Sequence, residues 1–344
     1  CSRNISKYAK INRQTIQLYK LKDRDVLFNR TNSLKFVGRT GLFKKFSDED
    51  IVFASYLVRI KPNSKTVTPE YLTTFLNTKY GITDIKRRAR ISINQSNVNP
   101  EELKKVEIPL VSNTLQKKIT FLFDTAFKLI QKAETKYTEA ESILLSELNL
   151  SNWESKKQLS FIKNYSDTQK ASRIDAEYFQ PKYEEIINKI KSYKGGWDKL
   201  ENIISLKDNN FQPKEEQYYK YIELSHISNN GEITDCITEK GKKLPSRARR
   251  IVSEGDIIIS SVEGSLSKIA LIDRDYHRAL CSTGFYVINS NILNSETVLL
   301  VMKSLIGKLQ LKKGCSGMIL SAINKDELLK IVCPIIKKNT QNKI

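Results

Sequence analysis

The most informative side chains of this sequence are basic and amide groups that lie close together. Arg87, Arg88 and Arg90 are followed by Asn94 and Gln95. Guanidinium groups pair with phosphate oxygens and with guanine edges, and side-chain amides pair with adenine. This segment therefore predicts contact with nucleic acid. Cations at the end of a helix are also favoured by the helix dipole, so a purely structural role for the arginines stays open.

Three further segments have a similar composition and are candidates for the same kind of contact. A polar loop carries Arg30, Asn32 and Lys35, a dense run carries Lys242, Lys243, Arg247, Arg249 and Arg250, and a third segment carries Lys312, Lys313 and Ser316. A loop between two apolar strands is often only a hairpin, and a charged run is often a solvated face. Charge and position select these residues, but they assign no base to any of them.

The sequence contains no motif that supports catalysis. It has no Gly-x-x-x-x-Gly-Lys-Ser/Thr phosphate loop, no Gly-x-Gly-x-x-Gly fingerprint and no Gly-x-Ser-x-Gly elbow. The Asn/Asp-Pro-Pro-Tyr/Phe tetrapeptide of amino-methyltransferases is also missing. With two histidines and no Cys-x-x-Cys pair, a zinc site is not expected. We therefore predict no catalytic residue, no metal and no cofactor.

The elements that would position the basic segments occur twice. Asp25–Phe28 is matched by Asp256–Ile259, and each apolar strand is followed by a polar loop. Further on, four residues recur at an offset of 225: Asn99, Leu103, Val106 and Pro109 are matched by Asn324, Leu328, Ile331 and Pro334. In both copies strands precede a helix, which is predicted over 69–88 in the first copy and near 295–313 in the second. A turn, a short helix and a strand follow this helix, and the strand of the first copy is predicted over 106–110. This period is far longer than a solenoid repeat, so it predicts two related α+β domains.

Residues 115–148 contain neither Gly nor Pro and predict one long helix between the two copies, about 50 Å in length. Its apolar residues alternate in steps of three and four, which is the seam of a coiled coil. The seam residues that we expect to pair with another helix or dock a partner subunit are Ile119, Leu122, Ala126, Leu129, Ala133, Ala140 and Leu144. Packing of this helix on its own domain is the alternative.

The charge is concentrated on the two copies. The net charge is +20, of which residues 1–114 carry +12 (22 Lys and Arg against 10 Asp and Glu), whereas residues 115–148 carry none. Such basic surfaces favour a polyphosphate partner. The five cysteines, odd in number, indicate reduced thiols in a cytoplasmic protein, and no apolar run approaches the length of a membrane span.

These patterns define the expected domains. We expect residues 1–112 to form a first domain that is incomplete at its N-terminus, since only 24 residues precede Asp25. Residues 113–150 form the spacer helix, 151–172 a connector, 173–338 the second domain, and 339–344 the start of a distal helix that the sequence does not continue.

Several segments resemble the specificity subunit of type I restriction–modification systems. They are RIDAEYFQPKY (173–183), the paired openings DVLFNRTNS (25–33) and DIIISSVEGSLSKIALI (256–272), and the paired endings NPEELKKVEIPL (99–110) and NKDELLKIVCPI (324–335). The resemblance implies two target-recognition domains that each read one half of a split double-stranded DNA sequence. It also implies long helices that pair, set the distance between the half-sites and dock methyltransferase subunits.

The same resemblance implies that the chain is not itself an enzyme. Adenine methylation would belong to the methyltransferase subunits, and ATP-driven translocation and cleavage to a restriction subunit. One alternative is the recognition portion of a fused or two-subunit restriction enzyme and methyltransferase. Another is a coiled-coil scaffold whose basic domains bind an acidic protein.

Overall fold

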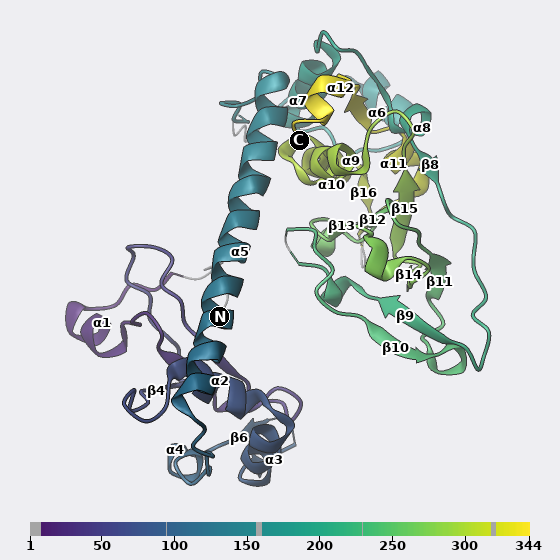
Figure 1. Ribbon diagram of the computed structural model, residues 1–344. Helices are drawn as coiled ribbons and strands as arrows, with labels where there is room; N and C mark the ends of the chain where they lie inside the picture. The colour runs from purple at the N-terminus through teal and green to yellow at the C-terminus, as the bar shows by residue number, and fades with distance from the viewer. Residues whose placement is uncertain (1–7, 94, 156–159, 229, 318–320) are drawn as a thin grey trace. The chain divides into compact units, whose positions relative to one another are not determined.

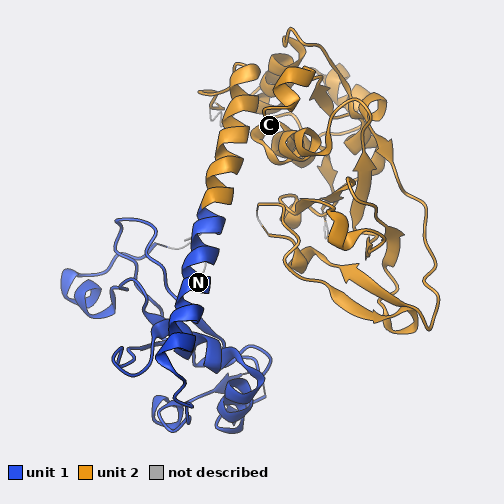
Figure 2. Cartoon of the chain, in the orientation of Figure 1, with its two compact units in different colours: residues 1–131 blue, residues 132–344 orange. Residues whose placement is uncertain are grey.

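The computed structural model describes residues 8–93, 95–155, 160–228, 230–317 and 321–344 and has an α+β fold (Figure 1). The chain divides into two compact units, residues 1–131 (unit 1) and 132–344 (unit 2), coloured separately in Figure 2. The division falls within one continuous helix, α5 (Asn113–Glu147). The long helix predicted for 115–148 is thereby confirmed.

Unit 1 is built from short strands and helices around one apolar core. Its elements are α1 (Arg13–Tyr19), β1 (Val26–Asn29), β2 (Thr31–Asn32), β3 (Thr40–Leu42), β4 (Leu57–Ile60), α2 (Pro69–Asn77), α3 (Lys79–Arg87), β5 (Arg90–Ile91), β6 (Ser96–Asn97), α4 (Pro100–Leu103) and the first part of α5. The side chains of β1 and α2 meet in the core, where Phe28 and Leu76 are fully buried.

Unit 2 has more elements. Its helices after α5 are α6 (Tyr165–Ala171), α7 (Pro181–Lys191), α8 (Leu200–Ile203), α9 (Ser295–Lys303), α10 (Leu305–Gly314), α11 (Lys325–Leu329) and α12 (Lys338–Gln341). Its strands are β7 (Trp197–Lys199), β8 (Ser205–Leu206), β9 (Tyr218–Ile222), β10 (Ile237–Lys240), β11 (Ala248–Ile251), β12 (Ile257–Ser260), β13 (Ile269–Leu271), β14 (Leu280–Ser282), β15 (Phe285–Asn289), β16 (Cys315–Ser316), β17 (Ala322–Ile323) and β18 (Val332–Pro334).

The repeat in the sequence is also a repeat in strand pairing. In unit 1 the central strand β1 lies between β3 and β4, and Val26 pairs with Leu42 on one side and Ile60 on the other. In unit 2 the central strand β12 lies between β13 and β15, and Ile257 pairs with Leu271 and Ile288. All of these pairings are antiparallel. The two units therefore share one local architecture although most of their side chains differ.

The helix predicted over 69–88 is divided in the structure. Thr78 ends α2 and caps α3, because its side chain accepts a hydrogen bond from the Gly81 backbone N–H at 3.3 Å. A Cβ atom on Gly81 would lie 2.4 Å from the Phe75 carbonyl oxygen, so only glycine allows this close turn. Gly307, which follows the equivalent break in unit 2, is packed against the Met302 carbonyl oxygen in the same way. The break is thus built into both copies.

A buried glutamine at the start of a helix makes the same three hydrogen bonds in each unit. Gln116 accepts from the Thr68 N–H and donates to the Thr66 and Val111 carbonyl oxygens. Gln341, 225 residues later, accepts from the Asn294 N–H and donates to the Ile292 and Ile336 carbonyl oxygens. Both side chains are 3% exposed. The position of α12 in unit 2 is therefore equivalent to the first turn of α5 in unit 1.

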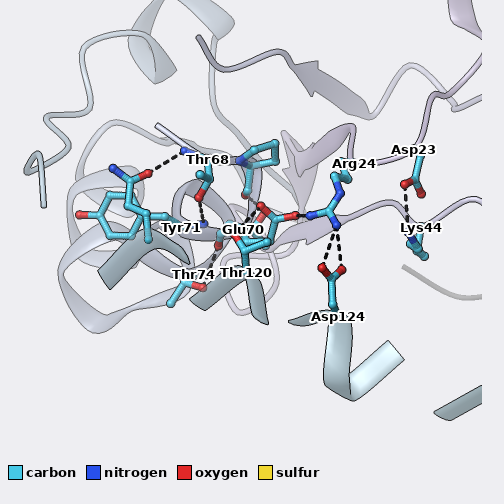
Figure 3. Close-up of polar contacts among 12 residues, drawn as sticks. Asp23, Arg24, Lys44, Thr68, Glu70, Tyr71, Thr74, Thr120 and Asp124 are labelled. Carbon is cyan, nitrogen blue, oxygen red and sulfur yellow. Dashed lines mark hydrogen bonds and ion pairs between the residues drawn. The ribbon is translucent and has the colours of Figure 1, made fainter. Parts of the chain in front are cut away.

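Charged groups hold the first part of α5 on unit 1, as Figure 3 shows. Arg24, whose backbone has a positive φ of 67°, forms an ion pair with Glu70 and donates to Asp124 at 2.8 and 3.0 Å. Glu70 is 1% exposed and also accepts a hydrogen bond from the Thr120 hydroxyl at 3.2 Å. A buried carboxylate needs such partners, so this network ties α5 to α2. In unit 2, Glu296 takes the place of Glu70 and is exposed.

The second part of α5 belongs to unit 2. Leu144 is fully buried in the core of that unit, and Tyr137 and Ala140 pack against the same core. Glu147 accepts hydrogen bonds from Tyr193 at 2.7 Å and from Thr340 at 3.2 Å. Each unit thus includes its own segment of the helix as an integral part of its structure.

Candidate nucleic-acid interface

In unit 1 a small sheet joins two of the basic segments predicted from the sequence. β2 pairs with β6, and β6 pairs with β5, so that Asn97 lies between Thr31 and Arg90. The Asn97 side chain donates to the Thr31 hydroxyl at 2.5 Å, and the Val98 N–H donates to the Arg30 carbonyl oxygen at 2.9 Å. The predicted polar loop and the predicted arginine segment are therefore neighbours in space, although more than fifty residues separate them in the sequence.

The arginines of this segment have different environments. Arg87 donates to Asp84 at 2.7 Å, and Arg88 donates to Asp84 at 3.1 Å and lies 3.6 Å from Glu102. Burial raises the pKa of Asp84, but the hydrogen bonds from Arg88 and Arg87 outweigh it and lower the pKa below its ordinary value. Arg90, on β5, is exposed. In the described structure Arg90 is thus the one of the three arginines for which no carboxylate partner is seen.

The remaining candidates of unit 1 are partly engaged. Gln95 is exposed, and Asn94 lies outside the described residues. The Asn32 side chain accepts from the Ser33 N–H at 2.8 Å. The Nε atom of Arg30 is buried and has no hydrogen-bond partner in the described structure, so this guanidinium is not fully paired within the chain.

Two residues beside Lys35 were not selected from the sequence. Arg39 stacks over the Phe36 ring at 4.4 Å, and Lys35 lies 5.4 Å from the same ring centroid. Ile91 and Ile93, next to Arg90 and Gln95, are 68% and 99% exposed. Apolar side chains exposed among cations can contact bases or sugars, and only their exposure in the fold identifies them.

Unit 2 forms the same type of junction. β16 pairs with β17, and Val262 of the polar loop 260–267 forms a bridge to Ala322. The Ile323 N–H donates to the Ser261 carbonyl oxygen at 2.8 Å. Ser316, on β16, is exposed beside this junction. The structure therefore places the loop and the 312–316 segment together, as it does their counterparts in unit 1.

Lys312 and Lys313 have partners that the sequence did not indicate. Lys313 lies 4.9 Å from the Tyr178 ring, with Arg173 at 4.4 Å from the same ring, and Lys312 lies 3.5 Å from Glu177. Arg173 also donates to the carbonyl oxygens of Lys313 and Cys315. Burial lowers the pKa of Lys313. This cluster attaches the 173–183 segment to the end of α10, which gives both lysines a structural role beside any contact with a ligand.

The basic run 240–250 lies on a separate sheet, in the order β10-β9-β14-β11. Lys242 pairs with Glu216 at 2.6 Å, and Lys243 lies 3.7 Å from Glu239. Arg249 donates to Gln212 at 2.6 Å, and the Nη1 atom of Arg250 is buried without a partner in the part of the chain that is described.

Arg247 is a member of this run whose backbone is connected to the polar loop through a turn. Its side chain is exposed, and its carbonyl oxygen accepts from the Thr283 N–H at 2.9 Å. The adjacent Gly284 carbonyl oxygen accepts from the N–H and the hydroxyl of Ser261, both at 3.0 Å. The 283–284 turn therefore connects Arg247 to the loop 260–267.

The predicted helix-pairing residues divide into two groups. Leu122 and Leu129 are 56% and 61% exposed, and Ala126 and Ala133 are exposed as well, whereas Ile119 is half-buried. Ala140 and Leu144 pack against the core of unit 2. The C-terminal end of the predicted seam is thus packed within unit 2. An exposed apolar stripe remains in the middle of α5.

No His, Cys, Asp or Glu cluster of metal-binding size occurs within residues 8–93, 95–155, 160–228, 230–317 and 321–344. In the same part of the chain, no helix has the length and apolar character needed to cross a membrane.

Comparison with known proteins gives sequence matches to restriction enzymes. No protein-family model matches the chain. It is 27% identical over 141 residues to the putative type I restriction enzyme MjaX specificity subunit of Methanocaldococcus jannaschii, covering 40% of this chain and 33% of that protein. It is 26% identical over 102 residues to the type I restriction enzyme EcoKI specificity subunit of Escherichia coli, covering 29% of this chain and 22% of that protein. The chain therefore spans a third or less of the length of these curated relatives.

Solved structures give matches of the same kind. The HsdS subunit from Thermoanaerobacter tengcongensis is 25% identical over 44% of this chain and 40% of its own, with a TM-score of 0.40. A type I restriction–modification S subunit from M. genitalium matches 94% of this chain and 75% of its own, at 16% identity and a TM-score of 0.33. These TM-scores are too low to establish a common overall fold, so the relationship rests on the sequence matches. Over the matched segments the chain is therefore similar in sequence to specificity subunits of type I restriction enzymes, as its paired motifs predict.

Proposed function

We propose that this chain is a non-catalytic subunit that recognises a bipartite double-stranded DNA target. Residues 1–112 would read one half-site and residues 173–338 the other, joined by the spacer helix 113–150 and the connector 151–172. The observation that carries the proposal is the repeated junction. In each unit a polar loop after the central strand is held against a second polar segment, by β2–β6 in unit 1 and by the Val262–Ala322 bridge in unit 2.

The two junctions share backbone pairing but not side chains. Unit 1 presents Lys35, Arg90 and Gln95, and unit 2 presents Arg247 and Ser316. Backbone pairing determines the scaffold, whereas side chains at groove edges determine which bases are contacted. Two copies with one scaffold and different polar groups are suited to reading two different half-sites.

The middle of α5 would serve a separate purpose. Its exposed apolar stripe, including Leu122 and Leu129, is of the type that pairs with another helix. We assign this stripe to helix pairing and to the docking of methyltransferase subunits, with the segment at Ala140 and Leu144 fixed inside unit 2. Methylation, ATP hydrolysis and cleavage would then be carried out by the methyltransferase and restriction subunits.

The test is a selection experiment. The chain, assembled with the methyltransferase subunits of its own system, is incubated with random duplex DNA at moderate salt, and bound DNA is sequenced. We expect enrichment of two short motifs at a fixed separation. No enrichment of any bipartite motif over the random pool would contradict the proposal.

Paired variants assign the half-sites. Replacing Lys35 and Arg90 by Gln should relax the base preference in one motif only, and replacing Arg247 by Gln should relax it in the other. If both changes relaxed the same motif, the assignment of one half-site to each unit would be wrong.

A further inference from the structure

The β5–β6 hairpin of unit 1 carries exposed apolar side chains at its turn. Two backbone hydrogen bonds close this turn, from the Ser92 N–H to the Gln95 carbonyl oxygen at 2.9 Å and from the Gln95 N–H to the Ser92 carbonyl oxygen at 3.4 Å. Ile91 is 68% exposed, and Ile93, which follows Ser92, is 99% exposed. Turns favour Gly, Pro, Asn, Asp and Ser, so the backbone does not explain an isoleucine at this position.

The equivalent hairpin of unit 2 is exposed as well. At the offset of 225, residues 316–317 are equivalent to residues 91–92, and both are exposed. Arg173 donates to the carbonyl oxygen of the adjacent Cys315 at 2.9 Å, so the 173–183 segment contacts the base of this hairpin and leaves residues 316–317 uncovered. Exposure of this turn is therefore a property of the repeated fold.

An apolar residue at the turn is also repeated in the sequence. At the same offset Ile93 is matched by Met318, which lies outside the described residues. The neighbouring residues differ between the copies, since Arg90 is matched by Cys315 and Ser92 by Gly317. An apolar side chain kept where its neighbours differ favours a contact that needs such a side chain.

Polar and cationic groups surround Ile93. Arg90 and Gln95, on either side of it in the sequence, are exposed. Lys35 is exposed too and follows β2 at the same end of the sheet, because Asn32 pairs with Ser96, the first residue after the turn. An apolar side chain among cations matches a nucleic-acid duplex, whose outer phosphates are anionic and whose bases offer apolar faces where a step is opened.

We propose that Ile93 is a wedge that enters the base stack of the half-site read by unit 1 and partly unstacks one base-pair step. The inference rests on the proposed function and adds deformation of the DNA to it. Opening a step loses stacking between the bases, and burial of the Ile93 side chain against them offsets part of that loss. Bending at the step also allows more of the protein surface to contact the backbone, where Arg90 and Lys35 meet phosphates.

Such a wedge makes unit 1 selective for the step that it opens. Pyrimidine–purine steps such as TA and CA are the most easily kinked and unstacked, so one of them is favoured at a fixed place in the half-site. Isoleucine has no hydrogen-bonding group in its side chain and contacts no base edge through a hydrogen bond. Its specificity comes from the cost of deformation, separately from Arg90 and Gln95, which can pair with base edges.

The test follows stacking within the bound DNA. The full chain, assembled with the methyltransferase subunits of its own system, is bound to its selected bipartite duplex. A fluorescent adenine analogue, whose emission rises when it is unstacked, replaces each base of the half-site in turn. We expect one step to brighten in the half-site of unit 1 and to stay dark with Ile93→Ala. Affinity of this variant should fall by roughly 5–50-fold, because it loses the burial of most of one apolar side chain.

Two further variants separate the wedge from a general effect. Ile93→Met keeps a long apolar side chain and should keep the bright step. Ile162→Ala is the matched control, since Ile162 is 95% exposed and lies in the connector, and it should change neither emission nor affinity. A base extruded for methylation also brightens, but at its own position, and that signal should persist with Ile93→Ala.

Selection from random duplex DNA with Ile93→Ala should lose the pyrimidine–purine preference in the half-site that Lys35 and Arg90 influence and leave the other half-site unchanged. If the chain selects a bipartite motif but no step depends on Ile93 for its emission, the wedge is overturned and the proposed function stands. If no bipartite motif is selected at all, the proposed function fails and the wedge fails with it. Weaker assembly of Ile93→Ala with the methyltransferase subunits, at unchanged emission, would make Ile93 a protein contact and also overturn the wedge.

Discussion

At the scale of single residues, the cations of the candidate interface fall into two classes. Arg87, Arg88 and Lys242 have carboxylate partners at 2.6–3.1 Å, so part of their charge is already compensated. Arg90 and Arg247 are exposed, and no carboxylate partner is seen for them in the described structure. A cation without an internal partner releases more free energy on meeting a phosphate, because no existing ion pair has to be broken.

Arg90→Gln should therefore weaken DNA binding more than Arg87→Gln, although the two residues are three positions apart. Loss of one phosphate contact reduces the slope of log K against log salt concentration by about 1, and affinity should fall by roughly 5–50-fold. Fluorescence anisotropy with duplex DNA at several salt concentrations measures both quantities. Equal effects of the two substitutions would show that the ion pair with Asp84 does not decide which arginine meets the DNA.

The thiols provide a second test at this scale. Burial raises the pKa of Cys333 to about 12 and that of Cys315 to about 11, and it also raises the pKa of Cys281. Cys236 is only partly buried. At pH 8 a thiol reagent should modify Cys236 quickly and the other three only after unfolding, as peptide mapping would show. Cys1 lies outside the described residues.

The same pKa shifts predict the direction of the pH dependence. An unfolded thiol ionises near pH 8.5, whereas the buried thiols stay protonated. The unfolded state is therefore stabilised relative to the folded state as the pH rises past that value. The contribution of these thiols to stability is fully present below about pH 8 and declines above it. Chemical unfolding at pH 7 and pH 10, compared with a Cys333→Ser variant, would measure the effect.

At the scale of elements, the two buried glutamines connect a helix start to the loop before α2 or α9. Each satisfies three backbone groups that would otherwise be buried without partners. Loss of such hydrogen bonds leaves polar groups desolvated, which costs more than the bonds themselves contribute.

Gln116→Leu and Gln341→Leu should each destabilise one unit by about 2–4 kcal/mol. Both tryptophans, Trp153 and Trp197, lie in unit 2, so tryptophan fluorescence follows that unit alone, whereas circular dichroism follows both. In urea, Gln341→Leu should shift the fluorescence transition, and Gln116→Leu should shift only a part of the dichroism transition. Gln17→Leu, at an exposed position of α1, is the control and should shift neither.

At the scale of the whole molecule, α5 is a structural part of both units. Gln116 and Asp124 fix its first part to unit 1, and Leu144 and Glu147 fix its last part to unit 2. The middle of the helix carries the exposed stripe and is the segment whose length can change without loss of these contacts.

If the helix sets the separation of the half-sites, inserting four alanines after Ile130 should add about one turn, or roughly 6 Å. Successive base pairs are about 3.4 Å apart along the DNA, so the preferred distance between the half-sites should increase by about 2 base pairs. The bipartite motif selected by the variant would measure this change. The same insertion in the connector 151–155 is the control, and an unchanged spacing for both would remove the helix from this role.

The sequence by itself determined the repeat, the long helix and the composition of the polar segments. These are local or periodic properties: an uninterrupted apolar seam specifies a helix, and matched residues at an offset of 225 specify related folds. It also selected the loop 29–35 and the segment 86–96 as two separate candidates for contact with nucleic acid. It could not show that β2 and β6 join them, because pairing between distant short strands depends on the whole fold.

Only the tertiary structure decided which charged side chains have partners and which apolar side chains are exposed. The ion pairs of Arg87 and Arg88, the stacking of Lys313 on Tyr178 and the exposure of Ile93 depend on side chains that the fold brings together. The split of 69–88 at Thr78 follows from the close packing of α3 on α2 at Gly81. The strand predicted over 106–110 is wrong, since these residues form no strand in the structure. A strand requires a partner that its own residues do not encode, and no described segment of unit 1 pairs with this one.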